Sequence, residues 1–204
     1  MVKGAPGNKG DKTGITRRRF TLGIVIASIV GAFGSLFSLL KVLSPAKEGG
    51  GYITTIKPGD RLVFAKGGKV GANIMVSSLN VGDAVLAYPE GKSSNPANLV
   101  QLIKLKETDF KPPTDIDLTD KGFVAYSAIC THLGCTVSWV KNKKSPDVSY
   151  TECFCHNSIF DPARGAKVMG GPAPIPLSQI GVKVKNDGTV VFTSDFQGPI
   201  GPQV

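Results

Sequence analysis

All four cysteines and both histidines of this 204-residue chain lie in two short stretches. The first reads Cys-Thr-His-Leu-Gly-Cys over residues 130–135, and the second reads Cys-Phe-Cys-His over residues 153–156. Thiolate and imidazole are side chains that bind iron, copper and zinc in proteins. Two separate stretches with this internal spacing are far more specific than one Cys-x-x-Cys pair. The pattern therefore indicates a fold built around a metal centre.

The number of donors leaves several kinds of centre open. A tetrahedral zinc site takes four ligands and leaves two cysteines without a role. Two ordinary disulfides would use every cysteine and leave both histidines incidental. A [2Fe–2S] cluster with two cysteines on one iron and two histidines on the other also takes four donors, and its spare cysteines can pair with each other. We favour this mixed-ligand cluster.

The two stretches resemble the two cluster-binding boxes of the Rieske iron–sulfur proteins, here C-T-H-L-G-C at 130–135 and C-F-C-H-N-S at 153–158. Gly-Pro-Ala-Pro at 171–174 resembles the proline loop that covers a third side of the cluster in this family. The resemblance is strong over residues 126–176 and only architectural elsewhere. It implies one Rieske-type [2Fe–2S] cluster as the cofactor.

The resemblance also implies a role for each donor. Cys130 and Cys153 match the thiolate ligands of the inner iron, whereas His132 and His156 match the imidazole ligands of the outer iron. His156 further matches the family histidine that is thought to hydrogen-bond the quinol, so we expect it to be the quinol contact and proton acceptor. His132 is then the second redox-linked titrating group.

Other residues of the boxes have implied roles outside the ligand set. Cys135 and Cys155 match the disulfide that ties the two cluster loops together in quinol-oxidising members, and Ser158 matches a donor to a bridging sulfide. Phe160 stands where many high-potential members have a tyrosine whose hydroxyl donates to a ligand sulfur. Because such donors stabilise the reduced cluster, losing one lowers the potential. We therefore expect a lower-potential member suited to a quinol such as menaquinol.

Two departures concern the second box alone. Phe154 replaces the usual proline and Asn157 replaces the usual glycine. Neither change removes a ligand, although the asparagine can alter the geometry of the loop.

A membrane span is predicted near the start of the chain. Residues 20–40 carry no charge, and 21 helical residues cover about 30 Å, the thickness of the hydrocarbon core of a bilayer. A cleaved signal sequence is the alternative, but residues 43–46 hold no A-x-A site. We expect a retained transmembrane anchor over residues 20–43.

The segment ahead of the span is basic. Thr-Arg-Arg-Arg-Phe-Thr-Leu at 16–22 resembles a twin-arginine export signal, although Arg and Lys also mark the cytoplasmic flank of any span. Both interpretations place the N-terminus in the cytoplasm and the domain outside the plasma membrane. Residues 1–19 supply +5 of the net charge of +9, so this tail is expected to meet membrane lipid. The remainder is mildly basic without a basic stripe, which argues against nucleic acid as a partner.

The rest of the chain predicts a tether followed by an all-β domain. Residues 44–51 contain proline and three consecutive glycines, which favours a flexible hinge, with a passive spacer as the alternative. Residues 52–204 form one predicted Rieske-type sandwich with an inserted cluster-binding lobe at 126–176. Asn186-Asp187-Gly188 marks a hairpin. The predicted strands cover 51–55, 61–65, 84–88, 99–105, 123–127, 136–140, 148–151, 182–185 and 189–193.

These features favour one function over three others. We expect the Rieske subunit of a quinol:cytochrome c oxidoreductase of the bc type, in which electrons pass from quinol to a cytochrome c1-, c- or f-type acceptor beside a cytochrome b-type subunit. The alternative is a Rieske electron-transfer subunit of an exported arsenite-oxidase-like molybdoenzyme. A soluble ferredoxin of a ring-hydroxylating dioxygenase needs neither the span nor the two extra cysteines. A non-redox structural module leaves the histidines unexplained.

Overall fold

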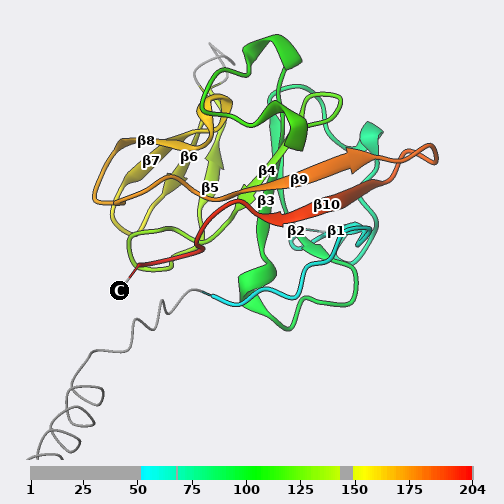
Figure 1. Ribbon diagram of the computed structural model, residues 1–204, viewed down its shortest axis with the longest axis horizontal. Coiled ribbons are helices and arrows are strands. Elements are labelled where there is room, and N and C mark those ends of the chain that lie inside the picture. Colours follow the sequence, from blue (N-terminus) through cyan, green and yellow to red (C-terminus); the bar gives the residue numbers. More distant parts are fainter. Residues whose placement is uncertain (1–51, 68, 143–148, 204) are drawn as a thin grey trace, which may run out of the picture. The chain divides into compact units, whose positions relative to one another are not determined.

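The computed structural model describes residues 52–67, 69–142 and 149–203. These residues form an all-β fold with ten strands, several single 3₁₀ turns and no α-helix among them (Figure 1). The strands are β1 (Leu62–Phe64), β2 (Asp83–Pro89), β3 (Val100–Lys104), β4 (Phe123–Ser127), β5 (Ser138–Val140), β6 (Tyr150–Cys153), β7 (Ser158–Asp161), β8 (Lys167–Gly170), β9 (Gln179–Val184) and β10 (Val190–Phe196). The all-β prediction is confirmed for this part of the chain.

The strands form two antiparallel sheets. The base sheet has the order β1-β2-β3-β4-β9-β10, and the small sheet has the order β5-β6-β7-β8. β4 pairs directly with β9 through Ala125 and Ile180, although the whole small sheet lies between them in sequence. The small sheet is therefore an insertion between two neighbouring strands of the base sheet.

Strand β4 connects the two hydrophobic cores of the fold. All five of its residues are buried. Alternate side chains point to opposite faces of the sheet, and both faces of β4 are covered by a core. Phe123 and Ala125 pack into a core enclosed by the base sheet, whereas Val124 and Tyr126 pack into a second core. The second core also contains residues of both boxes and of β7, so the metal-site cysteines are built into the hydrophobic interior.

The predicted strands agree with most of the observed ones. β4 matches its predicted bounds, and the Asn-Asp-Gly hairpin joins β9 to β10, where Asp187 Oδ1 accepts a hydrogen bond of 2.9 Å from the Thr189 N–H. β7 and β8 were not predicted, because their alternating pattern is short and interrupted by the second box and by Gly165. Each is only four residues long.

The predicted strand at 51–55 is wrong for the described residues 52–55, which are in irregular conformation. Side chains rather than a neighbouring strand satisfy the backbone here. Asn95 Nδ2 donates to Ile53 O at 2.9 Å, and Thr55 N donates to Asn98 Oδ1 at 2.9 Å. Lys92 Nζ donates to Thr55 O at 3.0 Å.

The predicted basic tail, twin-arginine-like signal and transmembrane anchor lie outside the described residues, as does the predicted hinge. Among the residues that are described, none belongs to a helix long and apolar enough to span a bilayer. The division of the chain into these segments and a cluster-binding lobe stays a prediction.

Candidate metal centre

The first box is a tight turn between β4 and β5. Cys130 N donates to Cys135 O at 2.8 Å, and Gly134 N donates back to Cys130 O at 2.9 Å. Gly134 has φ of +80°, a left-handed conformation that glycine adopts without steric cost. The turn is closed by the pairing of Ile129 with Thr136. The sequence between the two cysteines thus folds into one compact loop that holds His132.

The second box is the turn of the β6–β7 hairpin. Cys153 ends β6, Ser158 begins β7, and these two residues are paired across the strands. Asn157 has φ of +58°. Asparagine tolerates this left-handed conformation better than most residues other than glycine, so it serves at the position where glycine is usual. The departure noted in the sequence therefore preserves a turn that needs positive φ.

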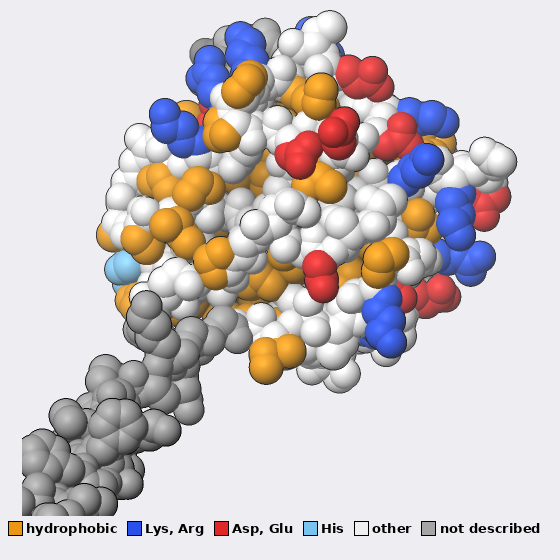
Figure 2. Space-filling view, in the orientation of Figure 1, with side chains coloured by type: hydrophobic (Ala, Val, Ile, Leu, Met, Phe, Trp, Pro, Cys, Tyr) orange, Lys and Arg blue, Asp and Glu red, His pale blue; other side chains and the backbone are white. Residues whose placement is uncertain are grey.

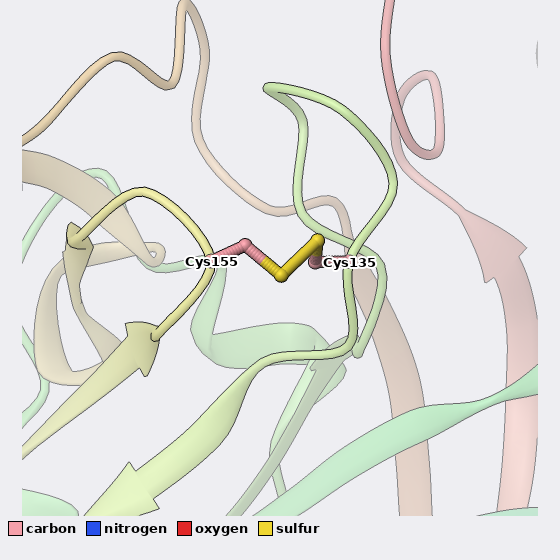
Figure 3. The surroundings of a disulfide bond; sticks show 2 residues. All are labelled: Cys135 and Cys155. Carbon is pink, nitrogen blue, oxygen red and sulfur yellow. A yellow bond between two sulfur atoms is a disulfide. The ribbon is translucent and has the colours of Figure 1, made fainter.

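A disulfide joins the two turns. Cys135 and Cys155 are bonded with their Cα atoms 6.5 Å apart, within the normal range for a disulfide (Figure 3). The bond holds the loop before β5 against the β6–β7 turn. The disulfide prediction is confirmed.

The remaining cysteines are free thiols in the second core. Cys130 is completely buried and Cys153 is 1% exposed. Burial raises the pKa of the Cys130 thiol, the His132 N–H lowers it, and the neighbouring Cys153 raises it further. Two neighbouring cysteine sulfurs in an apolar interior suit a metal cation that neutralises the charge of both thiolates when it binds.

The sulfurs of the site lie close together. The Sγ atoms of Cys135, Cys153 and Cys155 are all within 4.8 Å of one another. These three do not form a thiolate site, because two of them are already bonded to each other. The pair that can ligate iron is Cys130 with Cys153.

The two imidazoles meet at the same place. The ring centroids of His132 and His156 are 4.6 Å apart, with the rings nearly perpendicular. Nδ1 of His132 is buried and has no hydrogen-bond partner among the described residues, which is costly for a nitrogen unless it binds something. The residues present therefore fit a group that accepts two thiolates on one side and two imidazoles on the other. His156 is exposed, and Figure 2 shows a histidine at the surface beside hydrophobic side chains.

The loop at 171–174 packs on the second box. Ala173 N donates to Ser158 Oγ at 3.1 Å, which leaves the hydroxyl proton of Ser158 free to point toward the cysteines. A Cβ on Gly171 would lie 2.4 Å from Asn157 O, so only glycine permits this approach. On the other side, Thr131 Oγ1 donates to Ile175 O at 2.7 Å. Sequence reasoning missed this role of Thr131, for which its place between two ligand candidates was the only signal.

Phe160 lies in the core behind the thiols. It is completely buried on β7 and belongs to the same hydrophobic cluster as Cys130 and Cys153. Its ring therefore fills the interior next to the site, whatever its effect on the potential.

Comparison with known proteins agrees with this geometry. A family model described as a Rieske [2Fe-2S] domain matches residues 100–184. A cytochrome b6-f complex iron-sulfur subunit of Nostoc is 35% identical over 182 residues, which cover 87% of this chain and 84% of that protein. The chain belongs to the Rieske iron–sulfur protein family.

Other Rieske relatives come from different complexes. The cytochrome bc1 complex Rieske iron-sulfur subunit of Streptomyces lividans is 33% identical, covering 62% of this chain and 76% of the relative. A putative respiratory nitrate reductase subunit Rieske of Haloferax mediterranei is 32% identical, covering 65% of this chain and 57% of the relative. The cofactor of this Rieske protein is a [2Fe–2S] cluster, and the cysteine and histidine set described above fits it.

Proposed function

We propose that this Rieske protein is the iron–sulfur subunit of a quinol:cytochrome c oxidoreductase of the bc type. It takes one electron and a coupled proton from quinol and passes the electron to a cytochrome c1-, c- or f-type acceptor. Relatives named as subunits of bc1 and b6-f complexes support this proposal, as does the disulfide between the two boxes. The proposed partners include a cytochrome b-type subunit and the lipid of the plasma membrane, with the domain on its outer side.

We assign the ligands as Cys130 and Cys153 on one iron and His132 and His156 on the other. The buried thiols and the partnerless nitrogen of His132 support this assignment. When bound, the cluster supplies one-electron redox chemistry at a potential above that of clusters with four thiolates.

The observation that carries the function is the exposure of His156. Three of the four assigned ligands are buried or half-buried, whereas the His156 side chain reaches the surface. Each box also carries one exposed apolar side chain next to a ligand candidate, Leu133 at 61% and Phe154 at 62% exposure. An apolar surface around one accessible imidazole suits a hydrophobic quinol whose hydroxyl hydrogen-bonds the ring and gives up its proton there.

The hydrogen-bond donors around the two thiols affect the midpoint potential of the cluster, and the potential determines which quinol suits it. The hydroxyl of Ser158 lowers the pKa of the Cys130 thiol, so it lies where it can stabilise negative charge on sulfur. Phe160 offers no such donor. We propose that the protein is a lower-potential member of the family and uses a low-potential quinol such as menaquinol.

The decisive experiment is purification of the full chain from solubilised membranes together with its natural partners. We expect a b-type cytochrome and a c-type cytochrome to co-purify, and menaquinol to reduce first the Rieske centre and then the c-type haem.

Leu133→Ala should raise the KM for quinol. Ile116→Ala removes an equally exposed apolar side chain, 65% exposed on the η4 turn (Ile116–Leu118), and should leave the KM unchanged.

One relative is named for a different kind of complex. The Haloferax protein named as a nitrate reductase subunit has the same type of domain, so an electron-transfer subunit of a molybdenum enzyme, such as an arsenite-oxidase-like complex, is the alternative. Co-purification of a molybdopterin subunit in place of a b-type cytochrome would decide for it.

A further inference from the structure

The described chain begins with a short segment that is fastened to the base of the domain. Ile53 O accepts from Asn95 Nδ2 at 2.9 Å, and Thr55 makes hydrogen bonds to Asn98 and Lys92. The next residue, Ile56, is buried in the core of the base sheet. Residues 53–56 are thus held as part of the domain, immediately after the segment predicted as a tether.

Tyr52 extends this attachment to the first box. Its ring lies between two glycines, Gly134 of the first box and Gly201 near the C-terminus. A Cβ built on Gly134 would lie 2.6 Å from Tyr52 Oη, and a Cβ on Gly201 would lie 2.4 Å from Tyr52 Cε2. Both glycines have positive φ, +80° and +69°. Any larger residue at either position would displace the ring.

The C-terminal segment forms the other wall of this contact. Ile200 is 5% exposed, and Ser178 Oγ donates to Pro199 O. Pro202 Cδ approaches the Cβ position of Gly134 to 3.6 Å. In Figure 1 the start of the described chain (cyan) and its C-terminal end (red) both lie near the loop that holds the first box.

Gly134 belongs to the same turn as the ligand candidates Cys130 and His132. It lies between His132 and Cys135, and its N–H closes the turn onto Cys130 O at 2.9 Å. A ring that presses on Gly134 therefore limits how far the whole turn can open. Tyr52 as a whole residue is 37% exposed, so it packs at the edge of the site and not in the core.

We infer that Tyr52 is a positioning residue that seats the first cluster-binding loop against the start of the described chain and the C-terminal segment. The contact links the first described residues of the chain to the loop that carries His132. The seating of the loop by the Tyr52 ring does not rest on the proposed function.

The test compares three substitutions in the full, cluster-loaded chain in detergent. Tyr52→Ala should speed hydrogen exchange at the Gly134 amide about tenfold, equivalent to about 1.4 kcal/mol of lost local stability. It should also speed iron loss to a chelator and shift the EPR spectrum of the reduced centre. Tyr52→Phe removes the Oη atom nearest Gly134 but keeps the ring carbons, so both rates should fall between those of the wild type and Tyr52→Ala. Ile53→Ala removes the neighbouring side chain, which is 84% exposed, and should change none of these readouts.

Gly201→Ala tests the same contact from the opposite side. Its added methyl group displaces the ring, so it should reproduce the Gly134 exchange and EPR changes of Tyr52→Ala. The inference is overturned if Tyr52→Ala speeds exchange only within residues 53–56, or if amides of the base sheet such as Leu102 open to the same extent. Absence of quinol oxidation by the wild type would refute the proposed function and leave this exchange pattern standing.

Discussion

The base sheet and the small sheet are stabilised in different ways. In the base sheet, every residue of β4 is buried and β3 is buried at four of its five positions. In the small sheet, burial alternates along β6 and β7, and β8 has no fully buried residue. Strands this short do not make a stable sheet alone. The centre of the base sheet, at β3 and β4, is packed on both faces, whereas the small sheet packs on one face and depends more on cross-links.

Several such cross-links can be identified. The disulfide joins the two boxes, Tyr126 Oη donates to Pro162 O at 2.8 Å, and Thr151 Oγ1 donates to Gln101 Oε1 at 2.5 Å. Changes to them should loosen the small sheet and the metal centre while the base sheet persists.

The largest effect is expected from removing a ligand candidate. Cys153→Ser should abolish the cluster and its EPR signal, because one buried thiolate is lost from a centre that needs both. Wild-type protein should contain two iron atoms and two sulfides per chain, as a [2Fe–2S] centre requires. The far-UV circular dichroism of the base sheet should persist. As a control, Phe154→Ala changes the neighbouring exposed residue and should leave the metal content intact. Full cluster content in Cys153→Ser would contradict the ligand assignment.

Loss of the disulfide should come next. The bond joins residues 20 positions apart, for which loop-closure entropy contributes about 3 kcal/mol. Trp139, the only tryptophan, lies on β5 and its Nε1 donates to Gly82 O at 3.0 Å, so it reports on the contact of the small sheet with the base sheet. In Cys135→Ser we expect the tryptophan transition in urea to move to lower denaturant than the circular dichroism transition of the base sheet. Coincident shifts of equal size would show that the two sheets unfold as one unit.

A buried hydrogen bond between the sheets should have an intermediate effect. Burial raises the pKa of Tyr126, so its phenol remains a donor at physiological pH. Tyr126→Phe leaves the buried Pro162 carbonyl without this donor and should cost about 1–2 kcal/mol in free energy of unfolding. Tyr88→Phe removes the hydroxyl of a half-buried tyrosine that packs against the same core, and chemical denaturation should find it nearly neutral.

A smaller effect concerns the potential of the centre. Phe160→Tyr places a hydroxyl beside the buried cysteines and should raise the midpoint by an amount on the order of tens of millivolts, since a hydrogen bond to sulfur stabilises the reduced state. Ser158→Ala should lower it. Protein-film voltammetry measures both variants. If Phe160→Tyr forms the bond to the Cys130 sulfur without raising the midpoint potential, then hydrogen-bond donors to sulfur do not set the potential of this centre.

The smallest effect is expected at an exposed link between the sheets. Lys141 hydrogen-bonds Asp83 at 2.6 Å and lowers the pKa of its carboxyl group. The resulting stability is present above the pKa of the unfolded state, about 4, and is lost as pH falls through the lowered folded value. Because both side chains are solvated, the pair contributes about 0.2–1 kcal/mol. In urea unfolding, Asp83→Asn should remove that increment at pH 7 and leave stability unchanged at pH values below the lowered folded pKa.

Much of the metal centre was predictable because its chemistry is local in sequence. The cofactor and the Cys135–Cys155 pairing follow from resemblance within two short boxes, and the confirmed disulfide lies where that resemblance implied. The ligand roles of the other four residues stay predictions, supported by burial and by the partnerless His132 nitrogen.

The sheet order and the insertion were harder to predict. Sequence patterns located β4 and the β9–β10 hairpin, because long buried strands and an Asn-Asp-Gly turn are strong local signals. β7 and β8 gave no such signal, since each is four residues long and depends on pairing with its neighbour. Residues 52–55 show the opposite error, a strand predicted where none forms. Their β-forming residues bond to the side chains of Asn95 and Asn98 and not to a neighbouring strand.

The sequence by itself located the six cysteine and histidine donors, and the resemblance of their two boxes to the Rieske family implied the cluster. Only the tertiary structure decided which of them a partner can reach. Cys130 and Cys153 became interior residues by packing against β4 and Phe160, while the turn of the β6–β7 hairpin left His156 exposed. It also brought Tyr52 against Gly134, 82 positions away, a contact that depends on two glycines meeting one ring in space and leaves no trace in local sequence.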